Sequence, residues 1–184
     1  MPPDTLLCLC CLTVRQPFVQ FIILSWKSGE SRSQYRTLGS LENRYILLHV
    51  AKKVAKKEVE DQKTSALQIA QARNLPPSEI AQCLSACDDQ HTLGHVVAVV
   101  RLGKTTKLEP RHLDTEERRK KWENRTFVPA TDLEGMYVTQ ITEVHPVQTP
   151  WPLTGHQSRF RTEVSVGQLP PKLDHKILKL SHQP

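Results

Sequence analysis

Three charged side chains lie within six residues of one another near the N-terminus: Lys27, Glu30 and Arg32. An ammonium and a guanidinium both suit phosphate, and the planar fork of arginine can bind two phosphate oxygens at once. The carboxylate of Glu30 can orient Arg32 or accept a hydrogen bond from the edge of a base. We predict that the three groups converge at an anion-binding site. The alternative is a solvated loop with a Glu–Arg ion pair of little energetic worth.

The same side chains also permit catalysis. A lysine with a depressed pKa can act as a nucleophile or a base, here beside Glu30. A perturbed Lys27 pKa in a closed pocket would favour an enzyme, and an open groove lined by lysine and arginine would favour a binding module. The common hydrolase motifs, among them the phosphate-binding loop and Gly-x-Ser-x-Gly, do not occur in the sequence.

Hydrophobic patterns predict the elements that must position this segment. Residues 6–14 and 45–50 are apolar runs without polar alternation, as in strands buried on both faces. Between them, Pro17 suits the first turn of a helix, and the apolar residues that follow fall on one helical face. The predicted order is strand, helix ending near Lys27, charged loop and strand.

The rest of the chain alternates between regular and irregular stretches. The regular elements are expected to be two helices within 54–90, a strand at 94–102, a helix capped by Asp114 and running through Trp122, and strands at 136–143 and 159–166. The irregular stretches are expected to be a basic loop at 104–111, the proline-containing residues 144–157 and a tail at 167–184.

The chain has 184 residues, a formal net charge of +6 and an isoelectric point near 9.2, which favours an anionic partner. Its five cysteines show no disulfide framework, so we expect reduced thiols in a cytoplasmic or nuclear protein. The apolar N-terminal run is too short to span a membrane, and no membrane partner is expected.

Cys83, Cys87, His91 and His95 follow one another at intervals of four residues, a pattern that could hold a metal on a helix. Asp88-Asp89 and Gly94 interrupt the helix, however, and a short Cys-x-x-Cys knuckle is missing. We therefore expect neither a metal nor another cofactor.

Ser25-x-Lys27-x-x-Glu30-x-Arg32, preceded by Gln16-Pro17, resembles the signature of the ASCH (activating signal cointegrator homology) domain, a PUA-like family. The family has glycine where this chain has Ser25. The resemblance extends to residues 49–53, 94–102 and 146–164, and it is nearest to the endothelial-overexpressed lipopolysaccharide-associated factor group. It implies an α+β fold, a mostly antiparallel barrel of five or six strands with flanking helices. One domain would cover residues 6–166, with helical insertions near 54–90 and 112–124.

The resemblance implies an RNA-binding module, a cofactor of transcription, translation or RNA processing, that uses a basic cleft. The residues expected to bind nucleic acid are Gln16, Lys27, Glu30, Arg32, His49, Lys52, Lys53 and Arg159. An alternative for His49 is a core histidine satisfied by the backbone.

Two other functions stay open. One is a small hydrolase, an amidohydrolase or ribonuclease, in which Lys27 and Glu30 would be catalytic. Some small bacterial family members act on acetylated cytidine; they match at Lys27 but carry a hydroxyl residue at the position of Glu30. The other is a protein-interaction scaffold that binds a partner through the helices of residues 54–90. The basic run from Arg118 to Lys121, with Trp122, is a candidate nucleic-acid contact, and the favoured alternative is the exposed flank of a helix in an insertion.

Overall fold

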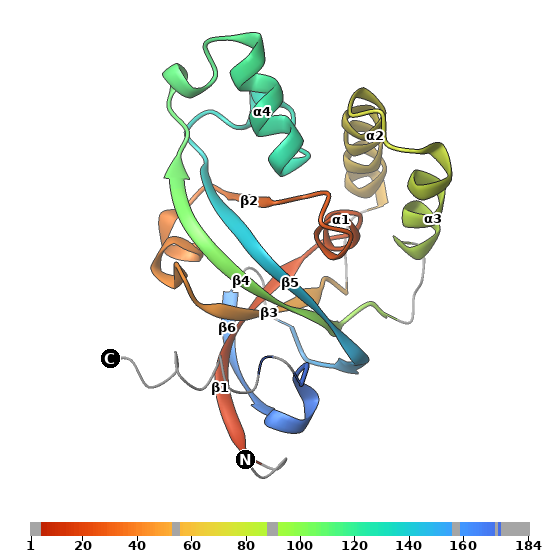
Figure 1. Ribbon diagram of the computed structural model, residues 1–184, viewed down its shortest axis with the longest axis vertical. Helices are drawn as coiled ribbons and strands as arrows, with labels where there is room; N and C mark the ends of the chain where they lie inside the picture. Colours follow the sequence, from red (N-terminus) through yellow and green to blue (C-terminus); the bar gives the residue numbers. More distant parts are fainter. Residues whose placement is uncertain (1–4, 53–55, 88–91, 156–158, 172, 174–184) are drawn as a thin grey trace.

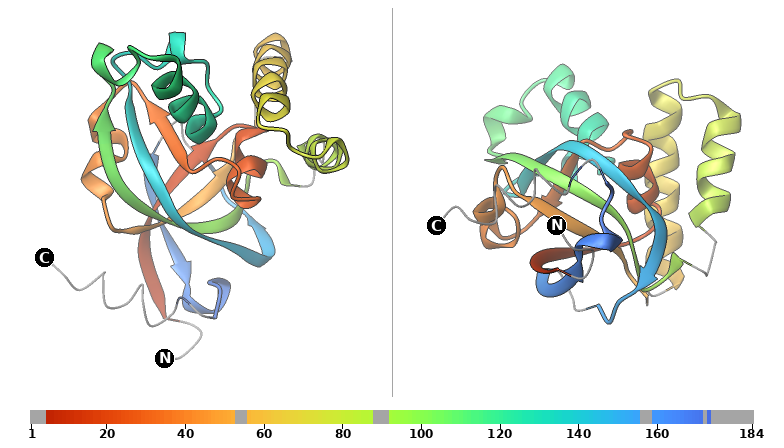
Figure 2. Two further views of the ribbon diagram at one scale, coloured as in Figure 1. Left: turned by 45° about the horizontal axis from the view of Figure 1, so that its top comes forward. Right: turned by 60° about the horizontal axis from the view of Figure 1, so that its bottom comes forward.

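The computed structural model describes residues 5–52, 56–87, 92–155, 159–171 and 173. Its main feature is a six-stranded sheet with the strand order β2-β5-β4-β3-β1-β6. The strands are β1 (Leu6–Val14), β2 (Gly29–Arg32), β3 (Tyr45–Val50), β4 (His95–Lys107), β5 (Tyr137–Pro152) and β6 (Arg159–Ser165). Neighbouring strands are antiparallel except for β1 and β3, which are parallel. The sheet is therefore mixed, and it curls strongly into a half-barrel (Figures 1 and 2).

The α-helices in the described part of the chain lie beside the curled sheet: α1 (Phe18–Ile23), α2 (Lys56–Ala72), α3 (Pro77–Cys87) and α4 (Glu116–Thr126). Figures 1 and 2 show α2 and α3 side by side next to α1, and α4 over the end of the sheet where β2, β4 and β5 meet. The described helices include none that is both long and apolar enough to cross a bilayer.

Both faces of the sheet are covered at its centre. One face packs against α1 through a cluster that includes Ile22 and Leu48, and the other packs against the segment that holds Leu169 and Leu173. All six residues of β3 are buried, which explains why its sequence is apolar without alternation. Part of the predicted tail, as far as Leu173, thus contributes to the core.

The prediction that residues 144–157 are irregular was wrong for residues 144–152, because β5 continues as far as Pro152, whereas residues 153–155 have no regular structure. Beyond Gln140, β5 is paired with β4 alone, since its pairing with β2 covers only Tyr137 to Gln140. A strand without a second neighbour tolerates proline, whose missing N–H would otherwise leave a gap in the ladder. The predicted basic loop at 104–111 was likewise partly wrong, because β4 extends to Lys107.

Two helix boundaries also differ from the predictions. Helix α1 ends at Ile23, earlier than expected. Helix α4 is capped by Thr115 rather than Asp114, since the Thr115 side chain accepts the N–H of Arg118, and it runs on to Thr126.

The described part of the predicted metal pattern consists of Cys83, buried in α3, and His95, the first residue of β4. The side chain of Cys87 and all of His91 lie outside the described residues. Among the residues that the structure describes, no three His, Cys, Asp or Glu side chains are grouped as a metal ion would require.

Candidate functional site

A tight turn after α1 positions Lys27 in the site. Ser25 has a left-handed backbone with φ of 59°. The N–H of Ser25 donates to the carbonyl of Ile22 at 2.9 Å, and the N–H of Trp26 donates to the carbonyl of Phe21 at 2.8 Å. These two bonds form a Schellman motif, and the Phe21 and Trp26 rings, 5.7 Å apart, supply its usual hydrophobic contact. The turn therefore requires a left-handed residue at position 25, where the ASCH signature has glycine.

The side chain of Lys27 is buried, with 2% of its surface exposed. Its ammonium lies 3.3 Å from Oε2 of Glu30 and donates a hydrogen bond to the carbonyl of Thr126. The ring of Phe18 covers it, with its centroid 5.1 Å from Nζ. The charge thus has a carboxylate, a carbonyl and an aromatic face as partners in place of water.

Lys27 is one of three donors that cap the C-terminus of α4. The last carbonyls of a helix have no partner inside it, and they carry the negative end of the helix dipole. Arg73 donates to Asn124, the N–H of Ser28 donates to Arg125, and Lys27 donates to Thr126. Helix α4 is therefore joined to the site through its C-terminal end, while the basic run from Arg118 to Lys121 is exposed on the same helix.

Glu30 links Lys27 to Arg32. Its Oε1 lies 2.7 Å from a guanidinium nitrogen of Arg32, and the same nitrogen donates to the carbonyl of Thr13 at 3.2 Å. Glu30 and Arg32 belong to β2, so they lie on a strand and not in the predicted loop. Residues two apart on a strand point to the same face, which brings the two side chains together.

The Nε atom of Arg32 is buried and has no hydrogen-bond partner. Leaving a buried donor without a partner costs about 1–3 kcal/mol.

Burial lowers the pKa of Lys27 below the ordinary lysine value of 10.5. Glu30 opposes this effect by attracting the ammonium, and Arg32 adds to it by repulsion. A lysine whose pKa is lowered in this way loses its proton more readily than an exposed lysine, so Lys27 has the electrostatics of a potential base or nucleophile.

These groups border a cleft of about 1420 Å³. Four of its described lining residues are cationic and two are anionic: Arg15, Lys27, Arg32, Lys52, Glu30 and Asp132. Hydroxyl groups of Thr13, Ser31, Ser33 and Thr154 lie between them, and Phe18, Leu93 and Phe127 add apolar surface. The cleft thus combines positive charge with hydroxyl donors and apolar walls.

The parallel strands β1 and β3 position residues on the same side of the cleft. In the pairing of β1 with β3, Thr13 lies opposite His49. Because the strands run in the same direction, the residues after each strand, Arg15 and Lys52, emerge at the same edge of the sheet. Both line the cleft, and Lys52 is exposed.

His49 is a buried wall of the cleft with 1% of its surface exposed. Its Nε2 donates to the carbonyl of Leu153 at 3.2 Å, and its Nδ1 lies 3.2 Å from the Thr13 hydroxyl. Burial lowers its pKa, which favours the neutral ring. A Cβ on Gly155 would lie 2.2 Å from His49 Cε1, so the backbone packs directly on the ring. His49 thus matches the alternative of a core histidine satisfied by the backbone.

The structure brings together Lys27, Glu30, Arg32, His49 and Lys52 among the predicted binding residues. Gln16 and Arg159 are not part of the lining. Gln16 accepts the N–H of Gln20 in the first turn of α1, and Arg159 donates to the Ser40 hydroxyl from β6. Lys53 lies outside the described residues.

Sequence reasoning missed the contributions of Arg73, Thr126 and Phe127. Arg73 lies 4.8 Å above the Phe127 ring, which packs in turn on Phe21 at 4.6 Å. Phe127 has a φ of 55°, an uncommon conformation for which the sequence offers no glycine or asparagine as a signal. The backbone carbonyl that Thr126 contributes is available from any residue type, so no pattern could identify it.

Replacing Ser25 with glycine should stabilise the protein. The left-handed conformation costs a non-glycine residue about 1–2 kcal/mol, and the greater freedom of glycine in the unfolded chain offsets about 0.5–1 kcal/mol of the gain. We expect the free energy of unfolding, measured in urea, to rise by about 0.5–1 kcal/mol. Ser33→Gly is the control, since Ser33 is not among the described residues with positive φ, and it should not stabilise. A loss of stability in Ser25→Gly would contradict the role assigned to this turn.

Replacing Lys27 with methionine should be strongly destabilising. The change keeps the length of the side chain but leaves the Thr126 carbonyl without its donor and Glu30 without one of its two cations. Breaking a buried ion pair in this way costs about 3 kcal/mol or more in the free energy of unfolding. Lys120→Met is the matched control, because Lys120 pairs with Glu116 on the exposed surface of α4 and should change stability little. Equal stabilities of the two variants would show that the buried ammonium contributes little.

No protein-family model matches this chain, and no curated protein matches it by sequence. Among solved structures, the chain is similar to the ASCH protein of Zymomonas mobilis, with 10% identity and a TM-score of 0.46 over 93% of this chain and 94% of that one. A serine-to-alanine variant of the same protein matches with 11% identity and a TM-score of 0.44 over the same shares. At this identity, the similarity gives no residue of this chain a role.

Proposed function

We propose that the cleft binds a nucleic-acid strand, with RNA as the expected partner. The observation that carries the proposal is the chain of ion pairs from Lys27 through Glu30 to Arg32 inside a basic cleft. Arg32 is the member of this chain that can reach a ligand, since 27% of its side chain is exposed and Lys27 is buried. Glu30 and the Thr13 carbonyl hold the guanidinium in place, so little conformational entropy is lost when a phosphate binds.

The size of the cleft favours a polymer over a small molecule. Pockets for small ligands usually have volumes of about 300–1,000 Å³, and this cleft has about 1420 Å³. A strand of several nucleotides would place phosphates near Arg32 and Lys52 and bases against the apolar walls. The hydroxyl groups in the lining can hydrogen-bond to sugars or base edges.

Lys52→Ala should weaken the binding of a single-stranded oligoribonucleotide and reduce its dependence on salt. Each lost contact to a single-stranded phosphate should lower the slope of log K against log salt concentration by roughly 0.7. Filter binding across a range of salt concentrations measures both effects. Lys120→Ala, on the exposed face of α4, is the control and should bind like the parent.

Arg32→Lys should weaken binding with little change in the salt slope, because it keeps the charge and removes the planar guanidinium that Glu30 and the Thr13 carbonyl hold in place. Parental affinity in both Lys52→Ala and Arg32→Lys would refute binding in this cleft.

A second candidate, a small hydrolase acting on a modified nucleoside or RNA, is favoured by the lowered pKa of Lys27 beside Glu30. As a base or nucleophile, Lys27 must be neutral, so activity should rise with pH, with a midpoint below 10.5. Release of acetate from acetylated cytidine is a direct assay. Glu30→Gln should abolish turnover while binding persists. If the parent protein releases no acetate at any pH up to 10.5, this amidohydrolase reaction is excluded.

A further inference from the structure

The cleft continues into a row of alternating basic and aromatic side chains. In the pairing of β2 with β5, Arg32 lies opposite Tyr137, and in the pairing of β5 with β4, Tyr137 lies opposite Lys107. Side chains of directly paired residues share a face of the sheet. Arg32, Tyr137 and Lys107 therefore cross three strands in a line, with the backbones of the two cationic residues about 10 Å apart at the usual strand spacing.

A second tyrosine extends this row. Tyr35 follows β2 in a short 3-10 turn, and its ring centroid lies 5.6 Å from that of Tyr137, edge to face. Tyr35 is 46% exposed, so part of its ring is open to solvent. Its hydroxyl donates to the carbonyl of Gly39 at 3.3 Å, and a Cβ on Gly39 would lie 2.1 Å from the ring. The exposed ring is thus held in a fixed position.

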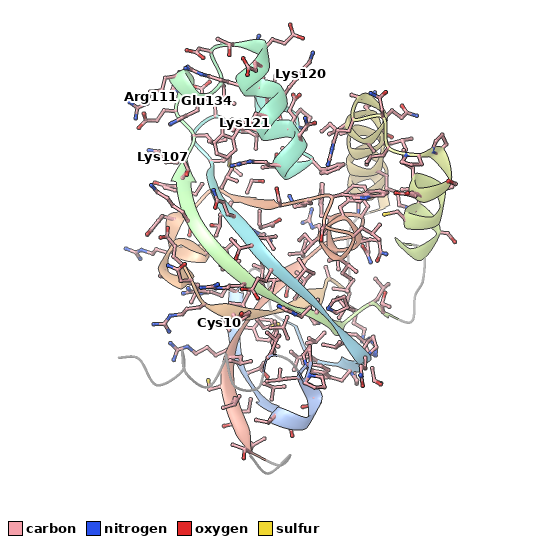
Figure 3. The ribbon with its side chains drawn as sticks, in the orientation of Figure 1. Cys10, Lys107, Arg111, Lys120, Lys121 and Glu134 are labelled. Carbon is pink, nitrogen blue, oxygen red and sulfur yellow. The ribbon has the colours of Figure 1, made fainter. Side chains whose placement is uncertain are left out.

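Lys107 lies at the outer end of the row. The ammonium of Lys107 lies 5.8 Å from the centroid of Tyr137. Figure 3 shows Lys107 near the end of β4, at the end of the molecule that carries α4. An anionic chain that leaves the cleft past Arg32 would meet the ammonium of Lys107 on this side.

We propose that Tyr35 and Tyr137 form a stacking site for an unpaired base, with the neighbouring phosphates held by Arg32 and Lys107. Aromatic rings interleaved with cations are the arrangement that binds single strands, since every base has a face to stack on and every linkage has a charge. A base within a duplex is stacked on its neighbours and cannot use such a ring. The inference rests on the proposed function and narrows it: the ligand is single-stranded, and its path runs from the cleft across β5 to Lys107.

The test measures the affinity of an oligouridylate and of a matched RNA duplex by fluorescence anisotropy at one salt concentration. Tyr35→Leu removes the ring, and it should weaken oligouridylate binding about tenfold while leaving duplex binding unchanged, because stacking on a ring contributes substantially for each base. Tyr35→Phe keeps the ring but removes the bond to Gly39, and it should bind within about twofold of the parent. Tyr35→Trp keeps an aromatic ring, so it should bind oligouridylate about as tightly as the parent, and the stacked base should quench the fluorescence of the new tryptophan.

Three outcomes would overturn the inference. If Lys52→Ala weakens binding but Tyr35→Leu binds oligouridylate like the parent, the cleft binds nucleic acid and the stacking site is refuted. If Tyr35→Leu weakens duplex and single strand equally, the ring does not select unpaired bases. If neither Lys52→Ala nor Tyr35→Leu alters binding, the proposed function fails, and the stacking site fails with it. Thermal melting of each variant confirms that the protein remains folded.

Discussion

The buried ammonium of Lys27 is the contact on which the rest of the site depends. Removing such a charge from water costs several kcal/mol unless partners replace the lost hydration. Glu30 supplies the opposite charge, and the Thr126 carbonyl supplies the negative end of the α4 dipole. Three segments that are distant in the sequence must therefore meet at one atom: the turn after α1, strand β2 and the end of α4.

This arrangement separates support from ligand binding. Glu30 offers one carboxylate oxygen to Lys27 and the other to Arg32, so the position of the guanidinium follows from that of the ammonium. Lys27 is buried at the base of this arrangement, whereas Arg32 is partly exposed in the cleft. His49 has a similar supporting role, since it links the Leu153 backbone to β1 through Thr13.

The curl of the sheet determines how large the cleft is and what lies beside it. Strands β4 and β5 are long and paired along most of their length, and they carry β2 at one end and the Leu153 segment at the other. Because the sheet bends around the parallel ends of β1 and β3, these distant regions border one cleft. Arg32 pairs with Tyr137 across β2 and β5, and Tyr137 pairs with Lys107 across β5 and β4, so these two residues lie in one row with Arg32 beside the cleft.

The sequence by itself determined the elements whose signals are local. Unbroken apolar runs identified β1 and β3, and alternation identified β6, because burial selects side chains residue by residue. The spacing of Lys27, Glu30 and Arg32 within six residues was sufficient to predict their convergence, and the structure brings them into contact. Glycine in the ASCH signature at the position of Ser25 agrees with the left-handed turn found there.

Only the tertiary structure decided what surrounds those three groups. Residues 29–32 form strand β2 because they pair with β5. Strand β5 can contain prolines beyond Gln140 because its pairing with β2 ends there. Lys27 caps α4 through the backbone carbonyl of Thr126. Every residue type has such a carbonyl, so the sequence could not identify this contact. Gln16 and Arg159 could not be separated from the cleft residues by sequence, since whether a polar side chain faces a ligand or a helix end depends on the path of the whole chain.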